Sequence, residues 1–520
     1  MAILITFLIL VLTASILLIL RIMVPGFRYS WSFAVGGALI AWISVLAWQF
    51  QMPISLQLPA WQPDTLFSQS PTFNADNISW AFAFSLITLC LAIIITAVVR
   101  PRFPGPINWV GTLVLTSLGM LSVAAANPLT LVLIWAAIDL VEVIVQIWFV
   151  EDPKLSERVV VSFASRAAGI LVLLWADLVG AAGGQISDFR AATSQTGIYL
   201  LIAAGLRVGV LPLHLPYPNE SALRRGFGTG LRMISAASSL ILLARIPASS
   251  INSPITPYLL ILVSFAALYG GWMWLRAPDE LTARPFWLIG MGSLVVAAAL
   301  RSNPIGAAAW SCALILPGSA LFLFSEQNRW LTRALYIGVF GISALPFSLT
   351  ASGWVSGGTG FWPAVPFLML SHAMLIAGYV RHAQRTLTRS PNEDQPIWAK
   401  NVYPVGIMLL LLSTIFLGLF GWAGALQIGN LFFALIVPIL TFGLLWLTPR
   451  LRILNPVRAH WVRPANESWL DWTYQELWNL YRQIGRASNA FTNLLEGESG
   501  IMWTLLFLVL FMTVFTQRTP

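Results

Sequence analysis

The sequence predicts an all-α fold: a polytopic transmembrane helical bundle with about sixteen spans. Of its 520 residues, 58% are hydrophobic and only 9% are charged, whereas a soluble domain carries roughly 25% charged residues. Apolar runs of about 17–25 residues, long enough to cross a bilayer, recur from end to end. The first run, Met1 to Leu20, lacks a basic leader and an obvious cleavage site, so we interpret it as a retained span.

The spans are delimited by apolar length and by turn signals. Asn127-Pro128 and Asn303-Pro304 are turn dipeptides, so each is expected to separate two adjacent spans. The expected spans are 1–20, 31–50, 77–99, 107–126, 128–150, 158–182, 196–216, 227–247, 254–275, 285–301, 305–325, 331–349, 361–381, 402–420, 427–447 and 501–516.

Charged residues alternate between the loops. Loops after odd-numbered spans carry the arginines, whereas loops after even-numbered spans are nearly neutral, with Arg190 and Arg301 as exceptions. The positive-inside rule then places the basic loops in the cytoplasm and both termini outside it. We expect the bundle to lie in the lipid bilayer of a bacterial cytoplasmic membrane or of an organelle inner membrane. The net charge of +9 follows from these loops and does not indicate nucleic-acid binding.

The chain offers no pattern for a cofactor, a metal or a catalytic group. Cys90 and Cys312 lie singly within apolar runs and resemble small core residues. A haem ligand pair, a cysteine cluster, a glycine-rich nucleotide loop and a metal constellation are all missing from the sequence. We therefore expect no cofactor and no soluble substrate. Only two lysines occur, Lys154 and Lys400, and both lie in loops.

Two carboxylates lie within the fifth span. Asp139 and Glu142 are three residues apart and share one helix face. Two buried carboxylates repel each other, which favours a proton held between them. Alternatively, each pairs with an arginine such as Arg166 or Arg207 and is static. Asp177 lies nearer a span end and is interpreted as interfacial.

The seventh span carries an arginine and a histidine beside prolines. Arg207 does not deprotonate in proteins, so it can clamp a carboxylate but cannot pass a proton on. His214 can titrate near neutral pH, although a lone histidine in a membrane also serves as a hydrogen-bonded packing residue. Both residues belong to the expected intramembrane polar network with Asp139 and Glu142. His372 is a weaker candidate, because only apolar and small residues surround it in the sequence.

Prolines interrupt two spans that lie five spans apart. Pro212 falls in the seventh span and Pro346 in the twelfth. Corresponding helix breaks in two five-span blocks are typical of an inverted repeat, and an odd number of spans gives the blocks opposite topology. Two unrelated proline kinks remain the alternative.

A C-terminal segment differs from the spans. Residues 464–500 place aromatic residues at helical spacing among charged ones, which predicts a lateral amphipathic helix in the membrane interface or along a neighbouring subunit. A solvated linker is the alternative. The expected divisions are 1–106 for the N-terminal spans, 107–247 and 254–381 for two five-helix repeats, 402–447 for the C-terminal spans, 464–500 for the lateral helix and 501–516 for a terminal anchor span.

The segment around the first break also carries a motif. It pairs Arg207 with Pro212-Leu213-His214, Pro218 and Asn219. This resembles the Lys-x-x-x-x-Pro-Leu-His-x-Trp-Leu-Pro-Asp motif of the antiporter-like membrane subunits of proton-pumping NADH:quinone oxidoreductase (complex I), which also occur in Mrp-type antiporters and membrane-bound hydrogenases. Arg207 stands at the family's lysine and Asn219 at its aspartate.

Three further segments carry the same resemblance. Leu242–Arg245 is similar to a Leu-Leu-Ala-Arg stretch, Phe73–Ser79 to an Asp-Gly-Leu-Ser signature, and Ala344–Pro346 to a Gly-Leu-Pro break. The resemblance covers nearly the whole chain. It implies an antiporter-like membrane-arm subunit that assembles with sibling membrane subunits and holds no redox cofactor.

The departures from the family affect its proton path. Ala136 stands where the family has a glutamate after the tryptophan of the fifth span, although Asp139 lies one turn on. Ala237 and Pro317-Gly318 stand near two family lysines. These departures predict a degenerate channel. Three functions remain open: a proton-conducting subunit of a redox-driven complex, a purely structural scaffold subunit, and a stand-alone cation/proton transporter.

Overall fold

The computed structural model describes most of the chain. The described residues are 2–24, 27, 29–59, 70–100, 105–149, 153–183, 188–214, 225–325, 329–355, 362–385 and 396–450, with five more between 475 and 483. The chain forms two units, Met1–Val457 and Arg458–Pro520. The first unit contains all the elements discussed below. The expected lateral helix and terminal anchor belong to the second unit and fall almost entirely outside the described residues.

The first unit begins with three helices and a β-hairpin. The helices are α1 (Ala2–Met23), α2 (Ser30–Trp48) and α3 (Asn77–Thr96), which continues as the short 3-10 helix η1 (Ala97–Val99). Between α2 and α3, strands β1 (Ile54–Gln57) and β2 (Thr72–Ala75) pair antiparallel, with Ile54 opposite Ala75. The hairpin lies in the nearly neutral loop between the second and third expected spans. β2 continues directly into the cap of α3, where Asp76 accepts a hydrogen bond from the Ser79 backbone.

Five helices follow, named here the first block. They are α4 (Pro106–Ala124), α5 (Pro128–Phe149), α6 (Pro153–Ala182), α7 (Ser194–Val208) and α8 (Arg225–Arg245), with η2 (Phe189–Ala191) before α7 and η3 (Ala248–Ile251) after α8. A capping box formed by Thr193 and Thr196 starts α7. The Asn127 side chain accepts from the Thr130 backbone at 2.9 Å, so the turn expected at Asn127-Pro128 does separate two helices.

Five more helices form the second block, and two helices close the unit. The second block comprises α9 (Thr256–Arg276), α10 (Arg284–Leu300), α11 (Pro304–Leu323), α12 (Arg329–Ile342) and α13 (Val365–Ala383), with η4 (Ala351–Trp354) and η5 (Trp362–Ala364) between α12 and α13. The closing helices are α14 (Ile397–Phe420) and α15 (Leu431–Arg450). Asn303 caps α11 as the second expected turn.

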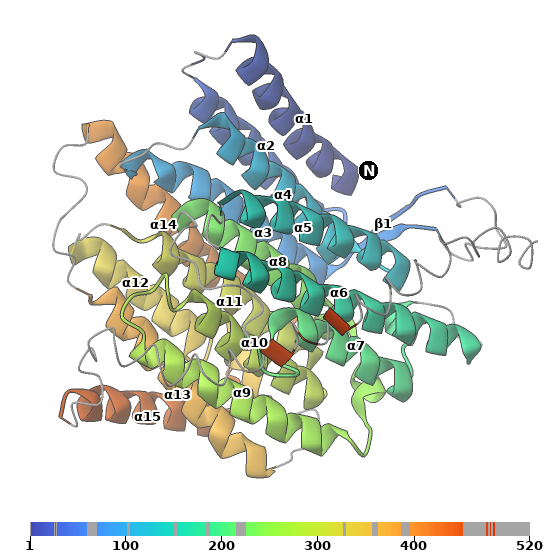
Figure 1. Ribbon diagram of the computed structural model, residues 1–520. Coiled ribbons are helices and arrows are strands. Elements are labelled where there is room, and N and C mark those ends of the chain that lie inside the picture. Colours follow the sequence, from blue (N-terminus) through green and yellow to red (C-terminus); the bar gives the residue numbers. More distant parts are fainter. Residues whose placement is uncertain are drawn as a thin grey trace, which may run out of the picture. The chain divides into compact units, whose positions relative to one another are not determined.

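Three helices form the centre of the bundle. In α3, α8 and α11 nearly every residue is buried, and the three helices contact one another. The sequences of α8 and α11 are rich in alanine, serine and glycine, which lets helix backbones approach closely in a membrane. Figure 1 shows α1 and α2 at one edge of the first unit and α13 and α15 at the opposite edge.

The two blocks share one contact scheme. Within each block, consecutive helices pack together, and the first helix also contacts the fifth: α4 contacts α8, and α9 contacts α13. The second helix contacts the fifth in both blocks as well. The two blocks meet where α8 packs against α11 and α10.

The predicted polytopic helical membrane bundle is confirmed. The described residues form fifteen α-helices, one for each of the first fifteen expected spans, and ten of them are long and apolar enough to cross a membrane. The expected ends of two spans are wrong. α7 ends at Val208 rather than 216, and α12 ends at Ile342 rather than 349. These helices of 15 and 14 residues are about 22 Å and 21 Å long, shorter than the roughly 30 Å hydrocarbon core.

Candidate functional site: a buried arginine–carboxylate cluster

Five charged side chains meet inside the first block. Asp139 and Glu142 project from α5, and Arg166, Arg207 and Arg232 come from α6, α7 and α8. No residue of the five is more than 1% exposed. We call these five residues the charge cluster. The three-residue spacing in α5 brings both carboxylates to one face, as the sequence predicts.

Arg207 clamps Asp139 in a bidentate ion pair. Its Nη1 lies 2.6 Å from Asp139 Oδ2, and its Nη2 lies 2.8 Å from Oδ1. Its Nε donates to Ser239 Oγ at 3.1 Å, and Nη1 also donates to the Arg166 backbone carbonyl at 3.2 Å. The guanidinium carbon sits 4.3 Å from the centroid of the Trp135 ring. Every nitrogen of this guanidinium is therefore engaged, and both oxygens of Asp139 are held.

Glu142 is bound by the other two arginines. Arg166 Nη1 forms an ion pair with Glu142 Oε2, and Arg232 Nη1 lies 3.6 Å from Oε1. Gln146, one turn along α5, donates to Oε1 at 2.9 Å. Arg166 also links the two pairs, because its Nε lies 3.9 Å from Asp139 Oδ1.

Packing as well as charge holds the cluster in place. A Cβ added at Gly169 of α6 would lie 2.6 Å from Cγ of Arg207, so glycine leaves the space that the arginine stem fills. With three guanidiniums and two carboxylates, the cluster carries a formal charge of 3 − 2 = +1. Buried ion pairs tolerate the loss of one partner poorly, because the other is left as an uncompensated buried charge.

The first helix break lies just after Arg207 and closes on its own backbone. Gly209 adopts φ 80°, and its N–H donates to the Leu206 carbonyl while the Val210 N–H donates to the Gly205 carbonyl at 2.9 Å. This is a Schellman motif, in which the left-handed residue favours glycine. Pro212, which lacks an N–H, lies in the turn that follows.

His214 lies at this break but apart from the charge cluster. Its Nδ1 is 2.8 Å from the Pro212 carbonyl, and its ring is buried. Among the described residues, Nε2 has no hydrogen-bond partner, and no hydrogen bond or ion pair joins the ring to Asp139, Glu142 or Arg207. The structure thus brings together three of the four residues of the expected polar network. Pro216, Pro218 and Asn219 lie outside the described residues.

The second helix break is closed by side chains. Ala344 and Phe347 have φ values of 57° and 64°, in the left-handed region, on either side of Pro346. Thr350 Oγ1 lies 3.1 Å from the Gly341 carbonyl, to which it donates, and accepts from the Ala344 N–H at 3.0 Å. The Gly341 carbonyl also accepts from the Thr350 backbone N–H at 3.2 Å, and a second carbonyl at the end of α12 is satisfied by a side chain from α13.

His372 of α13 provides the other of these contacts. Its Nε2 lies 2.6 Å from the Ile342 carbonyl, and its Nδ1 accepts from Trp354 Nε1 at 3.3 Å. Because Nδ1 accepts, the proton belongs on Nε2, where it is donated to the carbonyl. The ring is buried and packs edge-on against Trp310. The sequence made His372 only a weak candidate, because its two partners lie 18 and 30 positions away along the chain.

Aromatic donors occupy the interior of the second block. Trp287 Nε1 donates to the Leu314 carbonyl at 3.1 Å, and Tyr379 donates to the Pro317 carbonyl at 3.0 Å. A Cβ on Gly318 would clash with Trp287 Nε1. The position at which the resemblance implied a lysine is thus filled by an indole.

Two of the motifs that carry the family resemblance meet at the far end of α8. Arg245 donates to the Asn74 carbonyl at 3.0 Å and to Ser79 Oγ at 2.6 Å. Arg190 pairs with Asp76 at 3.0 Å. The pKa of the Asp76 carboxyl lies below its usual value: burial raises it, but the charge of Arg245 and hydrogen bonds from Ser79 and Arg190 outweigh burial. These contacts fasten the β-hairpin to the bundle.

Arg232 is the member of the cluster that sequence reasoning missed. Arg166 was recognised only as a possible partner of the carboxylates. The signal for Arg232 was present, because it stands seven residues inside the apolar stretch of α8, where a charged side chain is costly. The family resemblance places its eighth-span lysine at Ala237, five residues further along the same helix.

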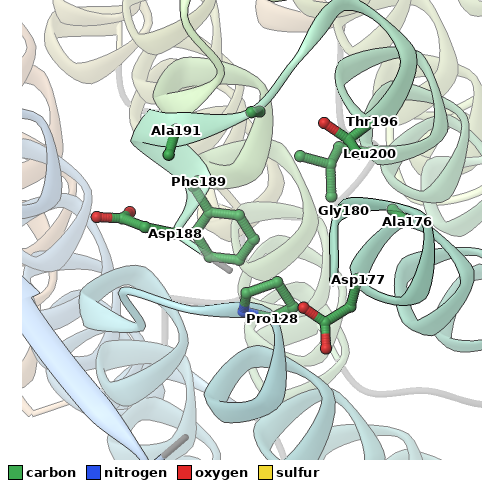
Figure 2. A pocket seen from close by; sticks show the side chains of 10 residues that line it. Pro128, Ala176, Asp177, Gly180, Asp188, Phe189, Ala191, Thr196 and Leu200 are labelled. Atoms are coloured by element: carbon green, nitrogen blue, oxygen red, sulfur yellow. The ribbon is translucent and has the colours of Figure 1, made fainter. Parts of the chain in front are cut away.

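A small cavity lies elsewhere in the first block. It measures about 30 Å³ and is lined by the start of α5, the end of α6, η2 and the start of α7. Figure 2 shows Asp177 and Asp188 at its wall with Phe189 and Pro128. Asp177 follows Arg166 by eleven residues, or about 16 Å along α6. A space of this size holds about one water and is separate from the charge cluster.

The sequence matches no protein-family model and no curated protein. Solved structures do match. A chain of the Mrp complex from Dietzia sp. DQ12-45-1b aligns over 100% of this chain with a TM-score of 0.71 and 16% identity. This chain spans only 63% of that one.

Two further structures match over most of both chains. A chain of the membrane-bound sulfane sulfur reductase, an archaeal respiratory membrane complex, aligns over 98% of this chain and 99% of its own, with a TM-score of 0.69 and 13% identity. A chain of respiratory complex I from Thermus thermophilus aligns over 85% of this chain and 100% of its own, with a TM-score of 0.65 and 17% identity. The chain therefore has the fold of membrane subunits found in Mrp and complex I-type assemblies, in agreement with the resemblance in its motifs.

Proposed function

We propose that this chain is an antiporter-like membrane-arm subunit of a redox-driven, complex I-like assembly, in which it joins sibling membrane subunits without conducting protons itself. The observation that carries the proposal is the bidentate Arg207–Asp139 pair at the position where the family resemblance implies a lysine. A relay residue must gain and lose a proton. Arg207 stays charged, and its partner carboxylate is held on both oxygens.

The second block supports the same proposal. Trp287 and Tyr379 occupy the interior near Pro317, and His372 uses both ring nitrogens to hold the break in α12. Each of these groups forms its hydrogen bonds with a fixed backbone or side-chain partner. A proton path from the charge cluster through this block would have to break those bonds, which costs about 1–3 kcal/mol for each buried group left unpaired.

The blocks themselves are proposed to be two inverted repeats, 107–247 and 254–381. Their shared contact scheme and the early end of the fourth helix in each block support this division. Five helices per block would give opposite topologies, with the breaks at Pro212 and Pro346 related by a pseudo-twofold axis in the membrane plane.

Proton conduction through the first block is the second candidate. The observation that favours it is the binding of Glu142. This carboxylate forms ion pairs with Arg166 and Arg232, but it is not held in a bidentate pair as Asp139 is. In that case Glu142 and Asp139 would carry the proton, with Arg207 as a fixed charge and His214 at the break. A stand-alone cation/proton transporter is the third candidate, which no contact among the described residues favours.

The test is proton translocation by the complex purified through a tag on this chain and reconstituted in proteoliposomes. We expect sibling membrane subunits to co-purify. We expect Asp139→Asn combined with Glu142→Gln to reduce assembly at least as strongly as proton uptake per electron. Asp177→Asn is the matched control, because it removes a carboxylate from α6 outside the charge cluster. Intact assembly with a clearly reduced proton ratio would restore the conducting candidate, and purification of an active chain without siblings would support a transporter.

We also propose the orientation that the basic loops indicate, in a bacterial cytoplasmic or organelle inner membrane with both termini outside the cytoplasm. The two native cysteines, Cys90 and Cys312, are fully buried, so an introduced cysteine can be labelled on a clean background. In intact cells, an impermeant thiol reagent should label a cysteine at Asn252 and spare one at Gln395. The reverse pattern would invert the topology.

A further inference from the structure

Among the described residues, a buried arginine at one end of the second block has no carboxylate partner. Arg301 forms the C-cap of α10 and is only 5% exposed. Its guanidinium carbon lies 5.5 Å from the centroid of the Trp354 ring and 6.0 Å from that of Phe433. These two rings stack on each other, with centroids 4.5 Å apart and planes 11° apart. The arginine therefore rests against an aromatic platform built from η4 and α15.

The helices around Arg301 supply no counter-charge among the described residues. Neither the elements that pack against α10 nor α15 and η4 contain an aspartate or a glutamate. Between Glu280 and the end of α15 the chain has three acidic residues: Glu326, Glu393 and Asp394. Glu326 follows α11, whereas Arg301 precedes it, and this 20-residue helix is about 30 Å long. The other two follow the C-terminal end of α13.

The guanidinium remains charged and only partly satisfied. An arginine side chain is always protonated in proteins, and the dipole at the end of α10 supplies only about half a negative charge. Among the described residues, Arg301 Nε is buried without a hydrogen-bond partner, and so is Ser352 Oγ. Ser352 lies close to Arg301 in the fold, because its carbonyl accepts from the Asn303 side chain at 2.8 Å. A ligand rich in acceptor oxygens would satisfy both donors.

The surroundings indicate which oxyanion fits. Phe433, which touches Arg301, lies between Phe432 and Leu435 on α15. The face of α15 formed by Leu431, Phe432, Leu435, Ile439 and Phe442 is exposed and entirely apolar. A cation on an aromatic platform thus adjoins an unpartnered apolar helix face. A phospholipid would match both features, since its headgroup carries the charge and its acyl chains cover the apolar surface.

We propose that Arg301, together with Trp354, binds the phosphate of an anionic phospholipid whose acyl chains lie along the exposed face of α15. The assignment is independent of whether the subunit conducts protons. Free inorganic phosphate offers the same charge and the same acceptor oxygens but gains nothing from α15. A carboxylate from a sibling subunit could also neutralise Arg301, and the experiment separates these cases.

The experiment uses the purified full-length chain in nanodiscs of phosphatidylcholine, with and without phosphatidylglycerol, and reads the midpoint of thermal unfolding. We expect phosphatidylglycerol to raise the midpoint of the wild type and to have little effect on Arg301→Gln. Inorganic phosphate in phosphatidylcholine discs should not reproduce the increase. Mass spectrometry of the protein released from the discs should show phosphatidylglycerol retained on the wild type. Arg301→Gln should retain at least about tenfold less of this lipid.

Arg276→Gln is the matched control. Arg276 also rests on a tryptophan, with its guanidinium carbon 5.3 Å from the Trp272 centroid. It is the last residue of α9, and this end of α9 is the one opposite the α10 C-terminus, where Arg301 lies. It should retain the phosphatidylglycerol effect. If Arg301→Gln fails to fold, Arg301→Lys keeps the charge and should keep part of the effect.

Three results would overturn the proposal. They are equal lipid retention by wild type and Arg301→Gln, full stabilisation by inorganic phosphate alone, and a lipid effect that is missing from the wild-type chain itself. The last of these would point to a carboxylate supplied by a sibling subunit.

Discussion

The two blocks share a contact scheme but fill their interiors differently. In the first block, α5 to α8 contribute five charged side chains that are almost completely buried. In the second block, the corresponding interior holds Trp287, Tyr379 and His372, each of which is bonded to a neutral partner. One helical scaffold therefore tolerates two quite different cores.

The difference teaches what the scaffold requires at its helix breaks. The first break is satisfied by its own backbone through a glycine at position 209, and the charge cluster lies beside it without closing it. The second break depends on Thr350 and His372 for its end carbonyls. In a membrane, the carbonyls of an interrupted helix must find partners inside the protein. Each block meets this requirement, the first locally and the second through residues from later in the chain.

The largest expected effect concerns the charge balance of the first block. Asp139→Leu removes one of two carboxylates and leaves Arg207 unpaired, which raises the formal charge of the cluster from +1 to +2. We expect a loss of about 3–5 kcal/mol in the free energy of unfolding. Arg232→Met should cost much less, because it brings the cluster to neutrality and its ion-pair contact, at 3.6 Å, is longer than those of Arg207. Thermal unfolding of the purified chain measures both.

A similar loss for the two variants would contradict the charge argument and point to packing as the main role of the cluster. Asp139→Leu combined with Arg207→Met provides a further check. Replacing a whole buried ion pair with apolar residues of similar size is often close to neutral. The double variant should therefore recover much of the stability that the single variant loses.

The sequence predicted much of this first block. The three-residue spacing of Asp139 and Glu142 and the always-charged Arg207 were enough to predict a carboxylate–arginine pair. The sequence shows Arg232 as a charge inside a span, but it does not show which residues Arg232 meets, because apolar length identifies α8 as a span without saying which of its faces meets α5. The hairpin was missed because its strands are only four residues long, too short for a clear alternation pattern.

The second block was less predictable for a physical reason. Charged residues inside an apolar run are conspicuous, whereas tryptophan, tyrosine and histidine are ordinary members of a membrane helix. Their roles depend on the backbone carbonyls of Leu314 and Pro317 in α11 and of Ile342 at the break after α12. Which carbonyl lies opposite which donor is decided by helix packing, and such contacts join residues 27 to 62 positions apart.

An intermediate effect is expected at His372. His372→Leu removes the donor to the Ile342 carbonyl and the acceptor for Trp354, leaving two buried polar groups unpaired. We expect a loss of about 2–3 kcal/mol, measured by thermal unfolding. His382→Leu is the matched control on the same helix. Among the described residues His382 has one hydrogen-bond partner, the Trp274 carbonyl at 3.1 Å, and its ring packs on the Trp274 ring, so the variant should lose about half as much. An equal loss would show that the break in α12 does not depend on His372.

The smallest effect distinguishes the two breaks by their left-handed residues. Gly209 has φ 80°, a conformation that costs an alanine about 1–2 kcal/mol, so Gly209→Ala should lower the stability of the first break. Ala344 already occupies that region with φ 57°, at the position where the resemblance implies a glycine. Ala344→Gly removes the strain but adds freedom to the unfolded chain, so we expect a gain of only about 0.5–1 kcal/mol. A loss of stability for Gly209→Ala and a gain for Ala344→Gly, both measured by thermal unfolding, would support this difference between the two breaks. A loss at Ala344→Gly would mean that its methyl group, which is buried, contributes more by packing than its backbone costs in strain.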